Sequence, residues 1–266
     1  MEYLFDKWDD VRKRIAGKPL FIFLDFDGTL APIVERPEAA SLPAETKELL
    51  RKLSAEPRFK LAFISGRSLA DVKEKVGLKN VIYSGNHGLE IEGPKIKFEP
   101  LVSAGYKTLM RGIKSELAKG IAAIKGALLE DKGLSLSLHY RLVAPRQLLD
   151  LRMIFRDAIA PHRLKGKIKV NKGKKVFEVR PAMEWDKGKI VLWLLARESF
   201  AAGEKEIVPV YLGDDLTDED VFRALKNKGL TVLVGNGRPS AAAYYVKDHR
   251  QVQRFLKMLL ESRLDR

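Results

Sequence analysis

Two aspartates separated by one phenylalanine stand at the end of a continuous apolar run near the N-terminus. Asp25 and Asp27 follow PLFIFL, and Gly28 and Thr29 complete the pattern. Such a run predicts a strand buried on both faces, with two carboxylates leaving its end. A Mg²⁺ held by a carboxylate, a backbone carbonyl and a third acid would offset their charge and screen an incoming phosphate. An Asp–Gly turn is the structural alternative, but the strand before it makes the pattern far more specific.

Two further tracts carry groups that suit a phosphate. Ser65, Gly66 and Arg67 end the second apolar run, where a hydroxyl and backbone N–H groups can bind phosphate oxygens. A helix N-cap is the structural alternative for Ser65. Lys187 precedes the apolar segment IVLWLLA, and a helix dipole disfavours a cation there, which indicates a functional role. The alternative is a solvated lysine in a turn.

A dense acidic tract, YLGDDLTDED, follows another buried strand. Acids this close repel one another unless a cation or a helix N-terminus receives them. Asp218 and Glu219 can cap the next helix and match its dipole. Asp214 and Asp215 stand at the tip of the strand and are better placed to bind a metal.

Five apolar β runs alternate with helical segments, which predicts an α/β fold with a doubly wound parallel sheet. The β runs cover 19–28, 60–66, 81–85, 211–215 and 230–237, and helices are expected over 43–55 and 68–77. In such sheets, ligands bind at the carboxyl ends of strands near the switch in strand order. The polar tracts described above all follow strands of this sheet or open its helices.

The rhythm of the sequence changes between residues 101 and 183. A helix–strand–strand unit occurs there twice, so we interpret it as an α+β cap inserted into a core of residues 1–100 and 184–266. The first helix carries one apolar stripe: Leu109, Ile113, Leu117, Ile121 and Ile124. The second unit is expected to end in a hairpin that turns at residues 171–174.

Alternation in LSLSLHYR predicts one face that covers the helices and another that is free for a ligand. The apolar face would carry Leu134, Leu136, Leu138 and Tyr140, and the polar face Ser135, Ser137, His139 and Arg141.

Composition narrows the classes of protein and of site. The chain has 266 residues and no cysteine, so a metal must be bound by carboxylate, imidazole or backbone oxygen, which favours Mg²⁺ or a similar hard ion. The net charge is +14, but basic and acidic residues are interspersed, so a nucleic-acid partner is not expected. No apolar run approaches the ~20 residues of a membrane span, and the N-terminus does not resemble a signal peptide, so we expect a cytoplasmic protein without a membrane partner. A monomer is favoured, although the sequence does not determine the oligomeric state.

Together the tracts resemble the haloacid dehalogenase superfamily of phosphatases. The resemblance rests on DFDGTL at 25–30, Ser65, Lys187 and GDDLTD at 213–218, in that order. Within that superfamily the chain resembles the trehalose-6-phosphate phosphatases. The motifs that carry this narrower resemblance are ISGR at 64–67, GNHGLE at 85–90, HYR at 139–141, EVRP at 178–181 and GDDLTDED from 213.

The resemblance implies Mg²⁺-dependent hydrolysis of trehalose 6-phosphate, in trehalose biosynthesis, through an aspartyl-phosphate. Asp25 would be the nucleophile and Asp27 the acid and then the base. Ser65 and Lys187 would bind the oxygens of the transferred group. The implied metal ligands are Asp25, the carbonyl of Asp27 and Asp214, with Asp215 or Asp218 in support. The implied substrate contacts are Gly66, Arg67, Asn86, His87, Glu130, Lys132, His139, Arg141 and Glu178.

Other interpretations remain open at this point. The chain could be a related phosphatase that acts on sucrose 6-phosphate or mannosyl-3-phosphoglycerate. A hypothesis from a different functional class is a non-catalytic protein that binds a phosphorylated ligand or nucleic acid. His139 could be an ordinary polar strand residue, and His87 could fix its loop instead of contacting substrate. Glu178 and Arg180 could form only a surface ion pair.

Overall fold

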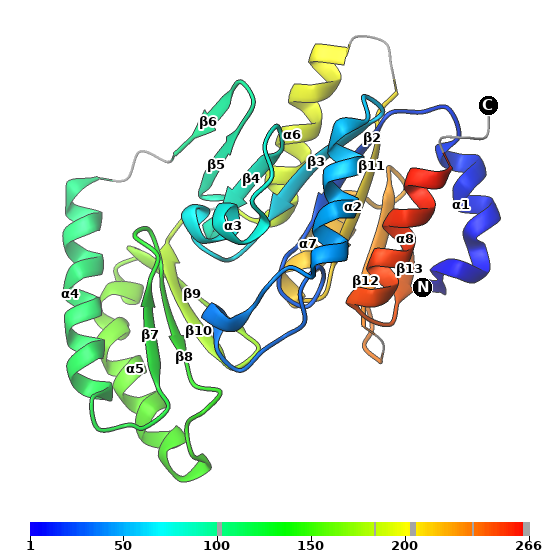
Figure 1. Ribbon diagram of the computed structural model, residues 1–266. Coiled ribbons are helices and arrows are strands. Elements are labelled where there is room, and N and C mark those ends of the chain that lie inside the picture. The colour runs from blue at the N-terminus through cyan, green and yellow to red at the C-terminus, as the bar shows by residue number, and fades with distance from the viewer. Residues whose placement is uncertain (100–102, 184, 203–205, 236, 263–266) are drawn as a thin grey trace. The chain divides into compact units, whose positions relative to one another are not determined.

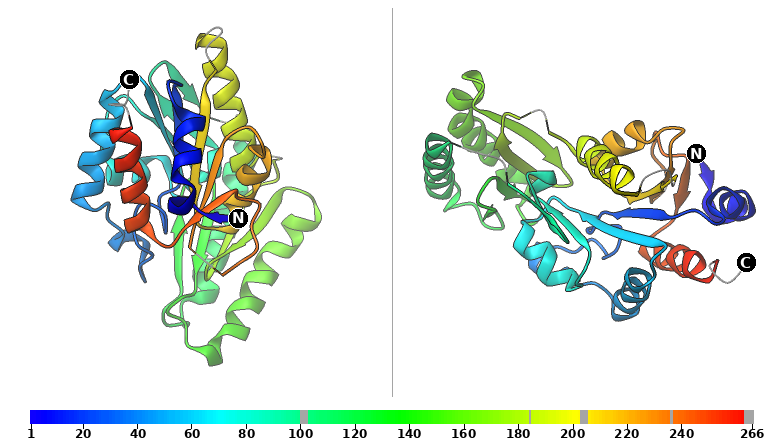
Figure 2. Two further views of the ribbon diagram at one scale, coloured as in Figure 1. Left: turned by 90° about the vertical axis from the view of Figure 1, so that its right-hand side faces the viewer. Right: turned by 90° about the horizontal axis from the view of Figure 1, so that it is seen from above.

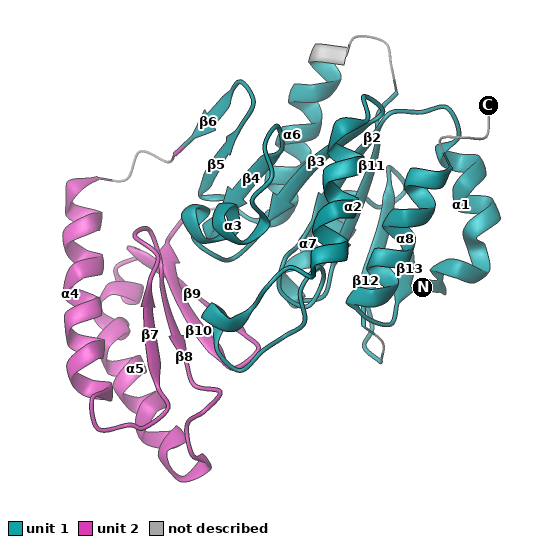
Figure 3. Ribbon diagram, viewed as in Figure 1, with its two compact units in different colours: residues 1–98, 185–266 teal, residues 99–184 magenta. Residues whose placement is uncertain are grey.

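The computed structural model describes residues 1–99, 103–183, 185–202, 206–235 and 237–262. Two compact units divide the chain, residues 1–98 with 185–266 and residues 99–184 (Figure 3). We call them the core unit and the cap unit. The sequence predicts domain boundaries at 100–101 and 183–184. Residues 100–102 and 184 lie outside the described part of the chain, so the predicted boundaries involve residues that are not described.

The core unit contains one mixed sheet in which, among the described residues, nine strands have the order β1-β13-β12-β11-β2-β3-β4-β5-β6 (Figure 1). All neighbours pair in parallel except β4 with β5 and β5 with β6. The strands are β1 Glu2–Tyr3, β2 Leu20–Leu24, β3 Phe59–Ile64, β4 Ile82–Gly85, β5 Glu90–Gly93, β6 Ile96–Phe98, β11 Val208–Gly213, β12 Leu230–Val234 and β13 Tyr244–Val246. Strand order reverses at β2, so the fold itself favours a ligand site at its carboxyl end.

Helices cover both faces of this sheet, as its apolar strands require. Figure 2 shows α2 and α8 on one face and α6 and α7 on the other. The side chains of β2 alternate accordingly, since Leu20, Ile22 and Leu24 join one core cluster and Phe21 and Phe23 the other. The core helices are α1 Trp8–Ile15, α2 Ala44–Ala55, α3 Leu69–Val76, α6 Lys187–Ala202, α7 Glu219–Ala224 and α8 His249–Glu261, with short 3-10 helices η1 Leu4–Lys7, η2 Pro37–Ala39, η3 Asn86–Gly88 and η5 Leu216–Asp218.

The described residues of the cap unit form an antiparallel sheet with the order β7-β8-β10-β9, two α-helices and one 3-10 helix. Its apolar residues, including Ile113 and Leu117 of α4, form a separate core cluster. The elements are α4 Ala104–Ile121, β7 Leu128–Asp131, β8 Leu136–His139, η4 Pro145–Gln147, α5 Leu148–Leu164, β9 Ile168–Gly173 and β10 Val176–Pro181.

Two sequence expectations for the cap unit are wrong in detail. The hairpin does not turn at 171–174, because β9 continues to Gly173, which pairs with Val176, and the turn is at Lys174 and Lys175. Lys175 adopts a positive φ of 66°, which the basic sequence does not signal.

The polar face of LSLSLHYR is not open along its length. Ser135 and Ser137 are each only 1% exposed, and the strand itself spans Leu136–His139. Leu136 and Leu138 do enter the cap core, but Leu134 is not part of that cluster.

The described helices are short relative to the thickness of a lipid bilayer or are interrupted by charged residues. The longest of them, α4, has 18 residues and carries three lysines and one arginine. Within the described ranges, no helix combines the length and the apolar character that crossing a membrane demands.

Candidate active site

Adjacent parallel strands bring the acids of two distant tracts together. Asp25 follows β2 and Asp214 follows β11, and the backbone N–H of Asp25 donates to the Leu212 carbonyl at 3.0 Å. Asp218 lies in η5, directly after that turn. Carboxylate oxygens of Asp25, Asp214 and Asp218 lie within 4.8 Å of one another, and all three residues are buried. The carboxyl edge of the sheet therefore gathers three acids, of which Asp25 and Asp214 follow strands as the sequence pattern predicts.

Lys187 is the cation inside this cluster. Its Nζ donates to Oδ1 of Asp25 and to Oδ1 of Asp218, at 2.8 Å in both cases, and its side chain is 3% exposed. The alternative of a solvated lysine is thus wrong. The residue opens α6, where the dipole disfavours a cation, so its charge is balanced by the carboxylates and not by the helix.

The environment shifts the pKa values of Asp25 and Asp218, the two carboxyls that contact Lys187, in opposite directions. Burial raises the pKa of Asp25 well above its ordinary value, since Lys187 only partly opposes it and the neighbouring acids add to it. Burial also acts to raise the pKa of Asp218, but Lys187 and other donors outweigh it, so that pKa is lowered. Burial lowers the pKa of Lys187, yet Asp218 and Asp25 more than compensate and raise it well above normal. Lys187 therefore contacts both carboxyls, and the environment favours the charged form of Asp218 more than that of Asp25.

Tyr211 is a site residue that the sequence did not indicate. Its hydroxyl donates to Oδ1 of Asp218 at 2.6 Å, and its ring is completely buried in β11. Oδ2 of Asp218 accepts the N–H of Asp215 at 2.8 Å. Asp218 is thereby held from three sides, with Lys187 as the third. A tyrosine inside an apolar strand looks like ordinary core, so only the fold reveals this contact.

The residues present fit a hard divalent cation. Three buried carboxylates face a single lysine, which leaves negative charge that oxygen-binding ions such as Mg²⁺ compensate. Gly28 adds a second sign, since a Cβ there would overlap the carboxylate of Asp214. The absence of a side chain at residue 28 therefore allows the Asp214 carboxylate to lie close to the loop after β2.

Gly28→Ala is expected to displace the Asp214 carboxylate and to raise the dissociation constant for a divalent ion by about tenfold or more. Gly28 also has a φ of +83°, so an alanine there is strained whatever the space. Gly17→Ala is the matched control, because Gly17 has a φ of +69° but nothing within 4 Å of its Cβ position. An unchanged metal requirement in Gly28→Ala would contradict the assignment of Asp214.

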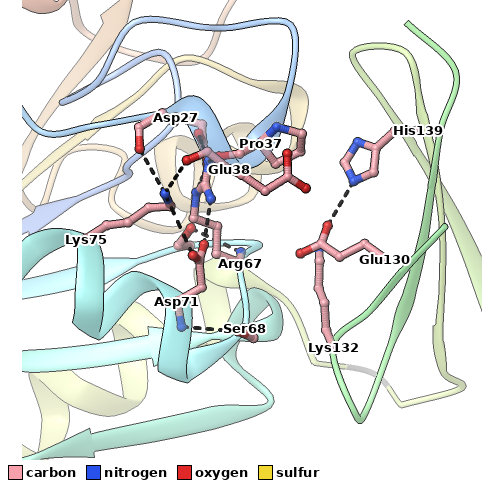
Figure 4. A network of polar contacts seen from close by, with 12 residues as sticks. Asp27, Pro37, Glu38, Arg67, Ser68, Asp71, Lys75, Glu130, Lys132 and His139 are labelled. Atoms are coloured by element: carbon pink, nitrogen blue, oxygen red, sulfur yellow. Dashed lines mark hydrogen bonds and ion pairs between the residues drawn. The ribbon is translucent and has the colours of Figure 1, made fainter. Parts of the chain in front are cut away.

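Asp27 and Arg67 form a bidentate ion pair (Figure 4). Nε of Arg67 donates to Oδ2 of Asp27 at 2.7 Å and NH2 donates to Oδ1 at 2.6 Å. Arg67 also donates to Asp71 at 2.6 Å and to the Pro37 carbonyl at 2.9 Å. The Arg67 guanidinium, which was expected to contact substrate, is therefore hydrogen-bonded to protein groups. The carboxylate of Asp27 faces Arg67, so the backbone carbonyl of Asp27 is the group expected to bind a metal.

Ser65 fixes the loop between β3 and α3. Its Oγ accepts the backbone N–H of Arg67 at 3.2 Å, and the residue is 1% exposed. The N-cap alternative for Ser65 is wrong, because α3 begins later and is capped by Ser68.

The GNHG segment lies against this loop. The N–H of Asn86 donates to the Arg67 carbonyl at 2.7 Å, and the N–H of His87 donates to the Ser65 carbonyl at 2.9 Å. Asn86 and His87 both have positive φ, 51° and 53°, a strain of ~1–3 kcal/mol each that is typical of functional loops. A Cβ on Gly66 would overlap the His87 imidazole, so this glycine admits the histidine.

Asp215, like the carboxylate of Asp27, is a predicted metal ligand that lies outside the acidic cluster. Its Oδ1 accepts the N–H of Leu216 at 2.6 Å, in a capping box with Asp218. Helix capping, the structural alternative for Asp218, therefore applies to both Asp215 and Asp218. Asp218 also lies beside Asp25 in the acidic cluster.

Within the cap unit, four predicted substrate contacts form one cluster. Glu130 accepts from or pairs with Nε2 of His139 at 2.9 Å (Figure 4) and lies 3.9 Å from Nζ of Lys132. Lys132 lies 3.5 Å from Glu178, and both side chains are less than a tenth exposed. Buried groups of both signs at this spacing can offer paired donors and acceptors to sugar hydroxyls.

Two further cap residues behave differently from expectation. Arg141 is exposed and donates to the Lys174 carbonyl at 3.1 Å. The alternative of a surface ion pair between Glu178 and Arg180 is wrong, since they are only 5% and 8% exposed.

The sequence matches one described protein family over most of its length. Residues 23–250 match the family described as trehalose-phosphatase. The chain belongs to the trehalose-phosphatase family. Trehalose-phosphate phosphatase B of Arabidopsis thaliana is 32% identical over 268 residues, which cover 96% of this chain and 70% of that protein. The trehalose-phosphate phosphatase of Mycobacterium tuberculosis is 36% identical over 238 residues, 88% of this chain and 59% of that one.

Solved structures agree with this trehalose-phosphatase assignment. The C-terminal domain of trehalose-6-phosphate phosphatase from C. albicans is 26% identical, with a TM-score of 0.82 and 98% of each chain covered. A haloacid dehalogenase-like hydrolase from Bacteroides thetaiotaomicron, 16% identical with a TM-score of 0.65 over 91% of this chain and 100% of that one, is similar in fold alone. The predicted superfamily fold and family are confirmed, and the chain is a phosphoric monoester hydrolase.

Proposed function

We propose that the protein hydrolyses trehalose 6-phosphate to trehalose and phosphate through a covalent intermediate on Asp25. Family membership supports the substrate, since relatives across 96% of the chain are trehalose-phosphate phosphatases. The observation that carries the mechanism is the contact between Lys187 and Asp25 inside a cluster of three buried acids. A carboxylate beside a fixed cation, at the carboxyl end of the central strand, suits a nucleophile that must meet an anionic phosphate.

In the first half-reaction, a carboxylate oxygen of Asp25 attacks phosphorus. The bond between phosphorus and the sugar oxygen breaks, and its electron pair stays on that oxygen, which takes a proton from Asp27. Lys187 and Ser65 bind the oxygens of the transferred phosphoryl group, and Lys187 also offsets charge on Asp25. Trehalose leaves, and the phosphoryl group is carried as a mixed anhydride on Asp25.

In the second half-reaction, water attacks the same phosphorus and gives a proton to Asp27, now the base. The bond between phosphorus and the Asp25 oxygen breaks, so phosphate leaves and Asp25 returns as a carboxylate. Asp27 thus returns to its starting state, and one water is consumed for each phosphate released.

Mg²⁺ is the proposed cation, and Asp25, Asp214 and the carbonyl of Asp27 would hold it. When bound, it neutralises phosphate charge and lowers the pKa of Asp25, so that the buried carboxyl stays ionised. Cytoplasmic location and the monomeric state remain predictions.

Phosphate release from trehalose 6-phosphate, measured with and without a chelator, tests this function. The proposal expects turnover that chelation abolishes and added Mg²⁺ restores. Parallel assays with sucrose 6-phosphate and glucose 6-phosphate test the narrower assignment. Equal turnover of all three sugar phosphates would contradict it and leave a broader sugar phosphatase.

Glu178→Ala is expected to lower kcat/KM for trehalose 6-phosphate by about 10–100-fold, because a buried carboxylate that accepts from a sugar hydroxyl would be lost. An aryl phosphate without a sugar should lose much less. The comparison uses steady-state kinetics on both substrates.

Glu116→Ala serves as the control, since Glu116 is an exposed glutamate of the same unit. Its kinetics on both substrates should match those of the unaltered protein. Equal losses on sugar and aryl phosphate in Glu178→Ala would argue against a sugar contact.

A further inference from the structure

Within the described part of the chain, the side chain of Asp27 is oriented by Arg67. The Asp27 side chain is 43% exposed, so packing does little to select its rotamer. Arg67 holds both of its oxygens in the fork geometry that only a guanidinium provides. Whatever fixes the guanidinium plane of Arg67 therefore also fixes the carboxylate of Asp27.

Three groups fix that plane. NH1 of Arg67 donates to Oδ2 of Asp71 at 2.6 Å, and NH2 also donates to the Pro37 carbonyl at 2.9 Å. The guanidinium carbon lies 5.2 Å from the centre of the Phe26 ring. Four of the five N–H groups of this buried arginine are thus used, and Asp71 is its second anionic partner.

Asp71 matters most when Asp27 acts. To give a proton to the leaving oxygen, one oxygen of Asp27 must turn away from Arg67. The arginine side chain is only 8% exposed, and a buried cation without an anion is costly. Asp71 keeps the guanidinium compensated and in place during that turn.

We propose that Asp71 is a positioning residue for the proton-transfer step, acting on Asp27 through Arg67; this rests on the proposed function, in which Asp27 is the acid. The sequence already indicates the contact between Arg67 and Asp71, because Asp71 stands four residues after Arg67, which is the spacing of a helical ion pair. A purely structural role is the alternative, since Asp71 lies in the first turn of α3 and its N–H is capped by Ser68.

The dependence of rate on the leaving group separates the two roles. Phenyl phosphate and p-nitrophenyl phosphate have nearly the same shape and no sugar, but nitrophenolate leaves well without a proton and phenolate does not. The readout is the ratio of kcat/KM for p-nitrophenyl phosphate to that for phenyl phosphate, because kcat/KM reports only the first half-reaction.

Asp71→Asn should raise this ratio by about tenfold, mainly through loss of activity on phenyl phosphate, and Asp27→Asn should raise it by about a hundredfold. Arg67→Lys, which keeps the charge and loses the fork, should also raise it and serves if Asp71→Asn folds poorly. Glu74→Gln removes an exposed carboxylate from the same helix and should leave the ratio unchanged.

Equal losses on both substrates in Asp71→Asn and Arg67→Lys, or no losses, would overturn the proposal while Asp27→Asn still raises the ratio. An unchanged ratio in Asp27→Asn would instead overturn the acid role of Asp27, and the positioning role with it. Thermal unfolding of each variant gives the accompanying measure of stability.

Discussion

Replacing Asp25 by asparagine is expected to abolish phosphate release, with a loss of at least about 10³-fold in kcat, as for other covalent nucleophiles. The amide has nearly the same shape and can still accept the hydrogen bond from Lys187, but it cannot attack phosphorus. Steady-state phosphate release from trehalose 6-phosphate measures the effect.

The same variant should fold as well as the unaltered protein. Burial raises the pKa of Asp25, which means that the folded state disfavours its charged form, so a neutral side chain removes a cost. The midpoint of thermal unfolding in chelator should stay the same or rise. Activity retained within tenfold would rule out Asp25 as nucleophile, and a large drop in the midpoint would make the loss of activity uninterpretable as chemistry.

Lys187→Met is expected to cost about 3–5 kcal/mol of unfolding free energy, because it leaves the buried carboxylates of Asp25 and Asp218 without their cation. For a chain of this size the midpoint of thermal unfolding should fall by roughly 10 °C. Phosphatase activity should be lost as well, since the transferred phosphoryl group and Asp25 both lose a positive partner.

Lys189→Met is the matched control, because Lys189 lies in the same helix with its side chain 46% exposed. Its midpoint and its activity should stay close to those of the unaltered protein. If Lys187→Met unfolded at the same temperature as this control, the buried ion pairs would not have the energetic role assigned to them.

Much of the core unit was predictable from the sequence because its central strands are mostly apolar along their length. The runs that became β2, β3, β4, β11 and β12 are apolar on both faces, and such runs have few other places in a fold. Polar tracts at their ends then had to meet at one edge of the sheet. Asp25 and Asp214 came from that argument, and Lys187 from its unfavourable position at a helix start.

The short strands near the two edges of the sheet were missed for a physical reason. The strands β1, β5, β6 and β13 have only two to four residues each. Segments this short carry almost no periodic signal, and their pairing depends on neighbours far away in sequence. The hairpin turn after Gly173 was misplaced similarly, because a lysine, and not a glycine, takes the positive φ.

Residues that act through other residues also escaped the sequence analysis. Tyr211 is part of an apolar strand, and only the position of Asp218 turns its hydroxyl into a site group. The family resemblance implied that Arg67 contacts substrate. The structure instead pairs it with Asp27 and Asp71, and those pairings depend on the path of the chain between β2 and α3.

The most direct test of the account is to locate the phosphoryl group during turnover. The protein would be mixed with trehalose 6-phosphate labelled in its phosphate, quenched in acid and digested, and the labelled peptide identified. We predict label on the peptide that contains Asp25, and none in Asp25→Asn. Label on another residue, or rapid phosphate release with no labelled peptide at any time, would contradict a covalent intermediate on Asp25.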